Sequence, residues 1–348
     1  MKIKTDKLFI ILFIVICMAP SVGMLIAGPS EAAANEILSP KPKMTKQNGS
    51  FDFSFLSAAS DWFDDRFAFR QEMASSWAKI NSLFFHTSVN EDVILGTDDW
   101  LYFADTAEDF SGVLLSDSTI EAAAARLSEL QKYCDDHGIL FVFTVAPNKN
   151  SLYPENMPAC YPKGEQNNVS RLYRRLDQLG VCYTDLHEAF RQKDEILYYK
   201  TDSHWNEKGA ALAADSLLTM LGVNSGYYLF GFTEGDVHEG DLFRMLYPSG
   251  KAEEQKLKWN GDFTFECKND ARKGEAIEFS TYCDTGKRNL LCWRDSFGVS
   301  LYPYLAQTFE NSDFLRSTDY SVQKIEEGNY DAVILEIVER NISWLARE

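Results

Sequence analysis

From about residue 118 onward, apolar residues alternate between helical and strand spacing. Residues 118–138 have an apolar face at helical spacing, a capping residue at Ser118 or Thr119, and a glycine stop at Gly138. The run ILFVFTVAP that follows is almost continuously apolar, as in a strand buried on both faces. The pattern is repeated by helix 169–180, strand 181–186, helix 206–222, strand 288–293, helix 298–309 and strand 330–339. Strands separated by such helices predict an α/β fold, a parallel sheet with helices on both faces.

The N-terminus has a different pattern. Lys2, Lys4 and Lys7 precede 21 residues without a charge, from Leu8 to Gly28. A run of that length spans a bilayer as a helix, and lysines before it predict a cytoplasmic N-terminus. A cleaved signal peptide with an Ala32-x-Ala34 site and a buried core helix are the alternatives. We favour an uncleaved anchor because the run is long for a signal peptide, so later residues face the outside of the membrane.

These patterns divide the chain into three parts. Residues 1–34 form the anchor, the polar stretch 35–54 is a linker, and 55–348 form the α/β domain. Within the domain, apolar residues at helical spacing occupy 55–85, and a strand, a turn and a second strand follow at 93–103. Residues 223–288 are rich in glycine and charge and interrupt the alternation, which indicates an insertion.

Seven cysteines are present, and Cys17 lies in the anchor. In an oxidising compartment the other six permit up to three disulfides. Cys267 and Cys283 flank a possible hairpin and are the favoured pair, whereas Cys292 lies in an apolar run and is expected to be a buried thiol.

Composition narrows the choice of partners. The 348 residues are 45% hydrophobic and carry a formal net charge of −18. That charge excludes nucleic acid as an expected partner, because phosphate binding needs a basic surface. An anionic polymer would need a local basic patch, for which Arg294, Lys149 and Arg316 are candidates.

Three polar clusters follow predicted strands. They are APNKNSLYPE after 139–145, TDSHWNEKG beyond 181–184, and RDSFG after 289–293. Ligands of a parallel α/β sheet bind at the carboxyl ends of its strands. The clusters are therefore expected to meet at one edge of the sheet and form a site.

The third cluster offers a nucleophile. Ser296 lies in a short turn between a strand and a helix, where backbone N–H groups can stabilise an oxyanion. Asp295 or Ser296 as an ordinary helix N-cap is the alternative. Asp202 and His204 are two positions apart, so on an extended segment they point to the same side. Ser296, His204 and Asp202 would supply the nucleophile, base and orienting carboxylate of a catalytic triad.

His204 also has two other interpretations, a surface histidine and a metal ligand. Asp236, His238 and Glu239 could complete a metal site, but no standard metal-binding spacing is present, so we predict no metal and no cofactor. The remaining histidines, His86, His137 and His187, are expected to be structural.

The motif TDSHWNEKGA, followed by the serine of RDSFG, resembles the alginate O-acetyltransferase AlgJ/AlgX-like group of the SGNH hydrolase superfamily. It is also similar to the related DHHW proteins. The likeness extends through DWFDDRFAFR, VILGTDDWLYF, APNKNSLYPENMP, GDLFRML and VILEIVERN, over about residues 55 to 345.

The resemblance implies a flavodoxin-like SGNH sheet and a role for several residues. The family's catalytic Asp-x-His pair matches Asp202 and His204, and its nucleophile matches Ser296. Weaker substrate-binding candidates are Tyr302, Asn148, Lys149 and Arg316. Arg294 departs from the family, which has glycine before the Asp-Ser pair. The chain also ends at Glu348 with no stretch for a carbohydrate-binding module, as in the membrane-anchored, single-domain AlgJ type.

The function implied is an extracytoplasmic O-acetyltransferase, anchored in a bacterial membrane, that moves acetyl through Ser296. Its acceptor would be an exopolysaccharide or cell-wall polymer, and a membrane-bound O-acyltransferase would supply acetyl. An acetylesterase with the same triad and a non-catalytic scaffold in a polysaccharide assembly complex are the alternatives.

Overall fold

The computed structural model describes residues 2–32, 36–46, 48–268 and 276–347. The chain divides into two compact units. The first comprises residues 1–95 and 239–252, and the second comprises 96–238 and 253–348. The second unit begins at Gly96, and residues 239–252 of the stretch predicted as an insertion lie in the first unit.

The first unit contains the N-terminal apolar helix. Its elements are α1 (Lys2–Ala27), α2 (Phe55–Asp64), α3 (Arg70–Phe85), β1 (Val93–Leu95) and α10 (Asp241–Leu246). Within α1, the segment Asp6–Ala27 is long and apolar enough to cross a membrane, as predicted. The candidate cleavage site Ala32-x-Ala34 extends into 33–35, outside the described residues.

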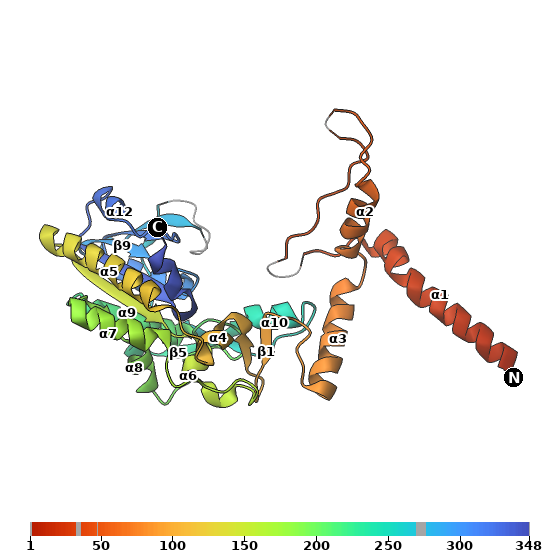
Figure 1. Cartoon of the computed structure of the whole chain (residues 1–348), viewed down its shortest axis with the longest axis horizontal. Coiled ribbons are helices and arrows are strands. Elements are labelled where there is room, and N and C mark those ends of the chain that lie inside the picture. The colour runs from red at the N-terminus through yellow and green to blue at the C-terminus, as the bar shows by residue number, and fades with distance from the viewer. Residues whose placement is uncertain (1, 33–35, 47, 269–275, 348) are drawn as a thin grey trace. The chain divides into compact units, whose positions relative to one another are not determined.

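The second unit contains the predicted α/β alternation (Figure 1). Its helices are α4 (Ala107–Phe110), α5 (Asp117–His137), α6 (Lys149–Leu152), α7 (Asn168–Leu179), α8 (Leu186–Arg191), α9 (Glu207–Met220), α11 (Gly298–Thr308) and α12 (Val322–Glu326). Short 3-10 helices are Ala104–Thr106, Pro154–Asn156, Tyr228–Phe230 and Glu339–Ala346 (η5). Its strands are β2 (Leu101–Phe103), β3 (Leu140–Ala146), β4 (Tyr183–Thr184), β5 (Phe232–Val237), β6 (Gln255–Trp259), β7 (Glu266–Cys267), β8 (Glu278–Tyr282), β9 (Asn289–Trp293), β10 (Asn311–Leu315) and β11 (Ala332–Val338).

The main sheet has the order β4-β3-β11-β9-β10-β8-β7. Its first five strands are parallel, and β8 and β7 extend it in antiparallel pairings. The sequence did not predict β10, β8 or β7. In β10 only Ser312 and Phe314 are buried, so this short strand lacks the continuous apolar run that marks β3 and β11.

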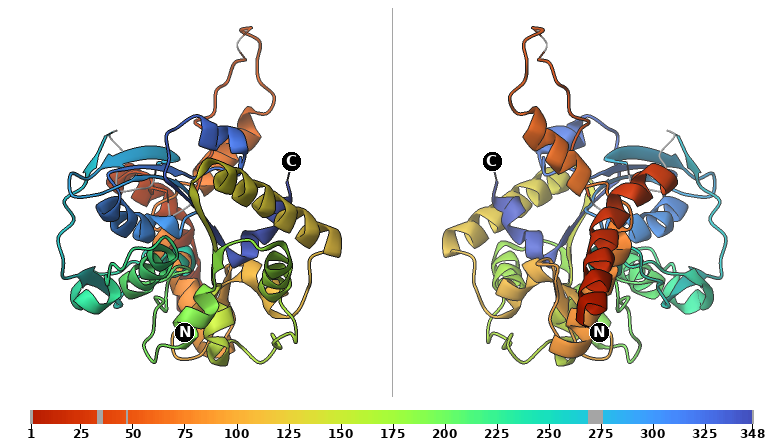
Figure 2. Two further views of the ribbon diagram at one scale, coloured as in Figure 1. Left: turned by 90° about the vertical axis from the view of Figure 1, so that its left-hand side faces the viewer. Right: turned by 90° about the vertical axis from the view of Figure 1, so that its right-hand side faces the viewer.

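Two hydrophobic layers cover the sheet, with helices on both sides (Figure 2). Alternate residues of β3 and β11 enter each layer: Val142 and Ile334 pack with α9 and α11, while Phe143 and Leu335 pack with α5 and α7. The α/β prediction is confirmed. One predicted cap is wrong: the oxygen of Ser116, not Ser118 or Thr119, accepts the N–H of Thr119 at the start of α5.

The predicted Cys267–Cys283 disulfide is also wrong. All seven cysteines are free thiols, and Cys267 pairs in register with Thr281 across β7 and β8. Cys283 lies two residues beyond that partner, and its thiol is 3.5 Å from the carbonyl oxygen of Gln307. Cys292 is buried, as predicted.

Candidate active site

A buried lysine holds the segment that carries Asp202 and His204. Nζ of Lys149 donates to the carbonyl oxygens of Tyr199 (3.1 Å), Lys200 (2.9 Å) and Asp202 (2.5 Å). Lys149 is 4% exposed, and its position at the carboxyl end of β3 directs the ammonium toward this segment. Three carbonyls around one cation fix the backbone of residues 199–202, because hydrogen bonds to a charged donor are about twice as strong as neutral ones.

Asp202, His204 and Ser296 form one hydrogen-bonded chain. Oδ1 of Asp202 accepts from the backbone N–H of His204 (2.9 Å) and lies 2.7 Å from Nδ1 of the same ring. Nε2 of His204 lies 2.9 Å from Oγ of Ser296. A carboxylate on Nδ1 selects the tautomer whose Nε2 is free to accept the serine proton. This geometry suits a serine nucleophile, a histidine base and an orienting aspartate.

A second histidine occupies the other oxygen of Asp202. Nε2 of His238 lies 3.0 Å from Oδ2, and the His238 ring stacks on Tyr199 with 3.7 Å between centroids. Burial tends to raise the pKa of Asp202, but the hydrogen bonds and charges of His204 and His238 outweigh it and lower that pKa well below its ordinary value. Asp202 is therefore ionised throughout the range in which histidine acts as a base.

Ser296 lies in the turn between β9 and α11. The carboxylate of Asp295 holds this turn by accepting the N–H groups of Phe297 (2.9 Å) and Val338 (2.7 Å). The N-cap residue of α11 is Phe297, with no side-chain cap hydrogen bond, so neither Asp295 nor Ser296 is the helix N-cap weighed from the sequence, and Ser296 Oγ lies against His204. Beneath the turn, burial and the charge of Asp295 raise the pKa of Glu336 well above its ordinary value.

Ser296 opens into a cavity of about 570 Å³. It is lined by Asp105, Arg294, Asp295, Ser296, Arg316, Ser317, Thr318, Tyr320, Arg340, Asn341 and Trp344. Three arginines and two aspartates give the lining of this cavity a positive balance of charge, on a chain whose net charge is −18. An anionic or polyhydroxylated ligand suits such a lining.

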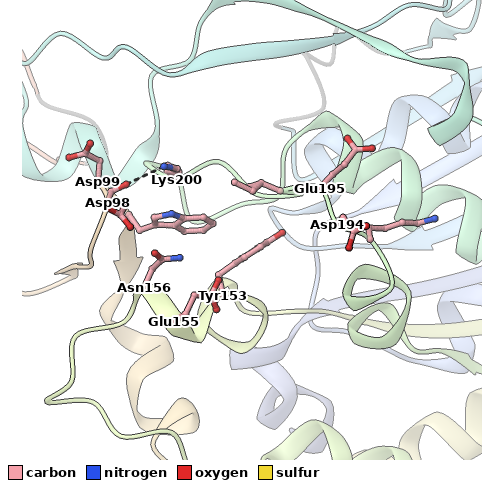
Figure 3. Close-up of a pocket in the computed structure, with 11 residues that line it drawn as sticks. Asp98, Asp99, Tyr153, Glu155, Asn156, Asp194, Glu195 and Lys200 are labelled. Atoms are coloured by element: carbon pink, nitrogen blue, oxygen red, sulfur yellow. Dashed lines mark hydrogen bonds between the residues drawn. The ribbon is translucent and has the colours of Figure 1, made fainter.

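A second cavity, of about 630 Å³, has the opposite balance (Figure 3). Five carboxylates line it with two lysines: Asp98, Asp99, Glu155, Asp194, Glu195, Lys193 and Lys200. Nζ of Lys200 donates to the carbonyl oxygen of Asp98 at 3.2 Å (Figure 3). Its negative balance makes this cavity unsuited to an anionic polymer.

The weaker candidates from the sequence have separate locations. Arg316 is exposed and lines the Ser296 cavity, whereas Lys149 is buried behind the Asp202 segment. Tyr302 is buried among aromatic rings, with Phe279 at 5.1 Å and Phe314 at 5.7 Å between centroids. Asn148 is 1% exposed, and its N–H donates to Oε2 of Glu339 at 2.7 Å. Only Arg316 of these four is a wall residue of the cavity at Ser296.

The residues weighed as metal ligands also separate. His238 reaches Asp202, while Asp236 is exposed on β5 and Glu239 forms an ion pair with Arg244. His187, expected to be structural, lies 3.1 Å from Oε2 of the buried Glu339.

Sequence reasoning missed the role of His238 beside Asp202 and the place of Arg340 and Asn341 in the cavity wall. Arg340 and Asn341 directly follow β11, so the rule that ligands bind at carboxyl strand ends would have indicated them. His238 follows β5, a strand outside the main sheet, and no sequence spacing connects it with Asp202.

Residues 93–257 match the family described as SGNH hydrolase-like domain, acetyltransferase AlgX. The chain is also 25% identical over 198 residues to a protein named "Probable alginate O-acetylase AlgJ" from Pseudomonas syringae pv. tomato, covering 56% of this chain and 48% of the relative. An AlgJ relative with the same name in Pseudomonas aeruginosa is 27% identical over 193 residues, covering 53% and 48%. The chain is thus similar to the AlgJ/AlgX-like group of SGNH hydrolase-like proteins over residues 93–257.

Solved structures agree with the fold of this chain. Bacillus cereus PatB1 with a sulfonyl adduct has a TM-score of 0.57 at 18% identity and covers 74% of this chain and 98% of PatB1. A DHHW family protein from Eubacterium siraeum has a TM-score of 0.54 at 14% identity and covers 72% and 95%. The SGNH-like fold is thus shown, and the chain spans about half the length of the curated AlgJ relatives it matches.

Proposed function

We propose that this protein is an extracytoplasmic O-acetyltransferase that carries acetyl on Ser296. The observation that carries the proposal is the chain of hydrogen bonds from Asp202 Oδ1 through His204 to Ser296 Oγ, at 2.7 and 2.9 Å. The similarity to relatives named as probable alginate O-acetylases and the SGNH-like fold add support. Ser296, His204 and Asp202 are the proposed catalytic residues.

Acetyl transfer takes two steps at these residues. His204 Nε2 removes the Ser296 proton while Oγ attacks the carbonyl carbon of the acetyl donor, and the departing group takes that proton from His204. His204 then removes a proton from an acceptor hydroxyl, whose oxygen attacks the acetyl-serine and releases Ser296 to take the proton back. The ionised Asp202 stabilises the imidazolium formed in each step.

The acceptor we propose is a polysaccharide of the exopolysaccharide or cell-wall class. The positive cavity at Ser296, with Arg294, Arg316 and Arg340, would suit an acceptor that bears carboxylates among its hydroxyls. Among the substrate-binding candidates named from the sequence, Arg316 is the one that we propose contacts the acceptor.

The proposed location is the outer face of a bacterial membrane. Residues 1–34 would anchor the protein, 35–54 would link it to the domain that follows, and the lysines before Leu8 would keep the N-terminus inside. A membrane-bound O-acyltransferase is the proposed source of acetyl, since no acetyl donor of the cytoplasm is available to the outer face unaided.

The test uses the full chain in detergent with an activated acetyl ester, followed by mass spectrometry. Wild type should gain about 42 Da on Ser296, the mass of one acetyl in a covalent intermediate. Ser296→Ala should gain none, whereas Ser317→Ala, the same change in the same cavity wall, should behave as wild type.

Acceptor oligosaccharides then separate the alternatives. Loss of the adduct to sugar supports a transferase, and loss to water alone with every acceptor supports an esterase. Equal labelling of wild type and Ser296→Ala would refute the serine mechanism and favour a scaffold.

A further inference from the structure

Helix α3 carries a stripe of exposed apolar side chains. The stripe consists of Phe69, Met73, Trp77, Ile80 and Phe84, which are between 45% and 70% exposed. Spacings of three and four residues place them on one face of the helix. Large side chains exposed side by side in this way mark an interaction surface.

The opposite face of α3 already has a partner within the same unit. Ser75 and Ala78 are buried, and Ser75 Oγ accepts the N–H of Ser249 at 2.9 Å. The hydroxyls of Ser82 and Tyr247 lie 2.8 Å apart. At 3.6 residues per turn, these serines lie about half a turn from the stripe. The helix is therefore fixed by one face and presents the other outward.

The stripe continues the apolar surface of α1. At Gly23 an added Cβ would lie only 2.7 Å from the ring of Phe69 and 2.8 Å from Cβ of Ala68, so the two segments touch. Ser30, just after α1, donates its N–H to the carbonyl oxygen of Arg66 and its hydroxyl to that of Phe67, both at 2.9 Å. The start of α3 is thus tied to the carboxyl end of α1.

We propose that the stripe on α3 lies against the lipid of the outer leaflet. The inference rests on α1 as a membrane anchor, and it is independent of acetyl transfer. Exposed apolar residues cover α1 from Leu8 to Ile26, and lipid is the environment that such a surface requires. Because Phe69 joins that surface to the stripe, the lipid around the outer end of α1 reaches α3. Trp77 near the middle of the stripe fits this position, since tryptophan prefers the membrane interface.

The contact makes the membrane a support for the first unit as well as an anchor. One face of α3 holds residues 247 and 249 while the other rests on lipid. The membrane would thereby restrict the motion of α3 relative to α1.

Tryptophan quenching in liposomes tests the proposal with the full chain. The fluorescence of Trp77 is the difference between wild type and Trp77→Phe, a change that keeps the stripe apolar. In phosphatidylcholine carrying bromine on its acyl chains, we expect most of this difference to be lost, while aqueous iodide leaves it intact. The matched control adds Lys79→Trp to the Trp77→Phe chain, which moves the indole to another face of α3; iodide should quench this one.

Each other outcome overturns the proposal. Quenching of Trp77 by iodide would place the stripe in water. Protection from both quenchers would mean that protein covers the stripe, and in liposomes holding this chain alone that protein would be another part of the chain or a second copy. Equal bromolipid quenching at residues 77 and 79 would mean that no particular face of α3 meets lipid. None of these results bears on labelling of Ser296.

Discussion

His238 should act as a positioning residue for Asp202, and His238→Ala removes its hydrogen bond. Nε2 of His238 lies 3.0 Å from Oδ2 of Asp202, a residue that is only 7% exposed. A hydrogen bond to a charged group contributes about 1.5–3 kcal/mol. If all of that stabilisation serves to hold the Asp202 carboxylate against His204, kcat should fall about 10- to 150-fold.

The same change has a predicted effect on acid unfolding. His204 and His238 lower the pKa of Asp202 in the folded protein below its unfolded value of about 3.9. The ionised Asp202 therefore adds folding stability above a pH of about 3.9, and this stability is lost as pH falls through the folded pKa. Without His238 the folded pKa rises. The acid unfolding midpoint of His238→Ala should therefore lie at a higher pH than that of wild type.

The assay is acetyl transfer at pH 8, with kcat and the acceptor KM measured separately. We expect the loss in kcat with little change in KM, because His238 does not line the cavity at Ser296. His238→Gln keeps an N–H donor near the same point and should recover most of the activity, whereas His137→Ala, an exposed histidine, should match wild type. Wild-type kcat in His238→Ala, or equal loss in His238→Gln, would refute the positioning role.

Three further changes test the supports around the site. Burial and the charge of Glu339 raise the pKa of Asp109 to about 7, so the ionised carboxylate costs folding stability as pH rises toward that value. Asp109→Asn should therefore stabilise the protein by about 2–4 kcal/mol at pH 8 and by much less at pH 5. Equal melting shifts at both pH values would contradict this. Lys149→Met should lower the free energy of unfolding by about 3 kcal/mol, because the carbonyl oxygens of residues 199, 200 and 202 lose their donor. It should also speed amide hydrogen exchange at residues 199–202. Unchanged exchange would mean that Lys149 does not hold this segment. Gly298→Ala should destabilise the protein by about 1–3 kcal/mol, since the new Cβ would lie 2.3 Å from Cδ and 2.6 Å from Cβ of Arg294. Arg294→Gly removes both of these atoms and should relieve that penalty in the double variant, whereas additive losses would exclude the clash.

The α/β layers could be predicted because β3 and β11 are buried along almost their whole length. Such strands leave a long apolar run in the sequence, and glycine stops such as Gly138 mark the helices between them. The meeting of Ser296 with His204 followed from the same rule about strand ends. Local pattern and sheet topology were sufficient for those features.

The support of the site could not be predicted in the same way. Lys149 reads as a substrate-binding residue because charged side chains in strand-end loops usually face solvent, yet here carbonyl oxygens surround its ammonium. His238 lies 36 residues from Asp202 and outside the main sheet, so only the three-dimensional fold brings the two together. Tyr302 matched a family position but packs in the core of this chain.

The charge at Ser296 depends on which buried carboxyls are ionised. Two imidazoles lower the pKa of Asp202, whereas burial and the charge of Asp295 raise the pKa of Glu336. If Glu336 were ionised, its charge would cancel that of one cavity arginine, and the positive balance near Ser296 would disappear. Because its raised pKa favours the neutral form of Glu336, the positive balance of the cavity arginines remains for an acidic acceptor. The raised pKa of Glu336 thus favours a positive site on a strongly acidic protein.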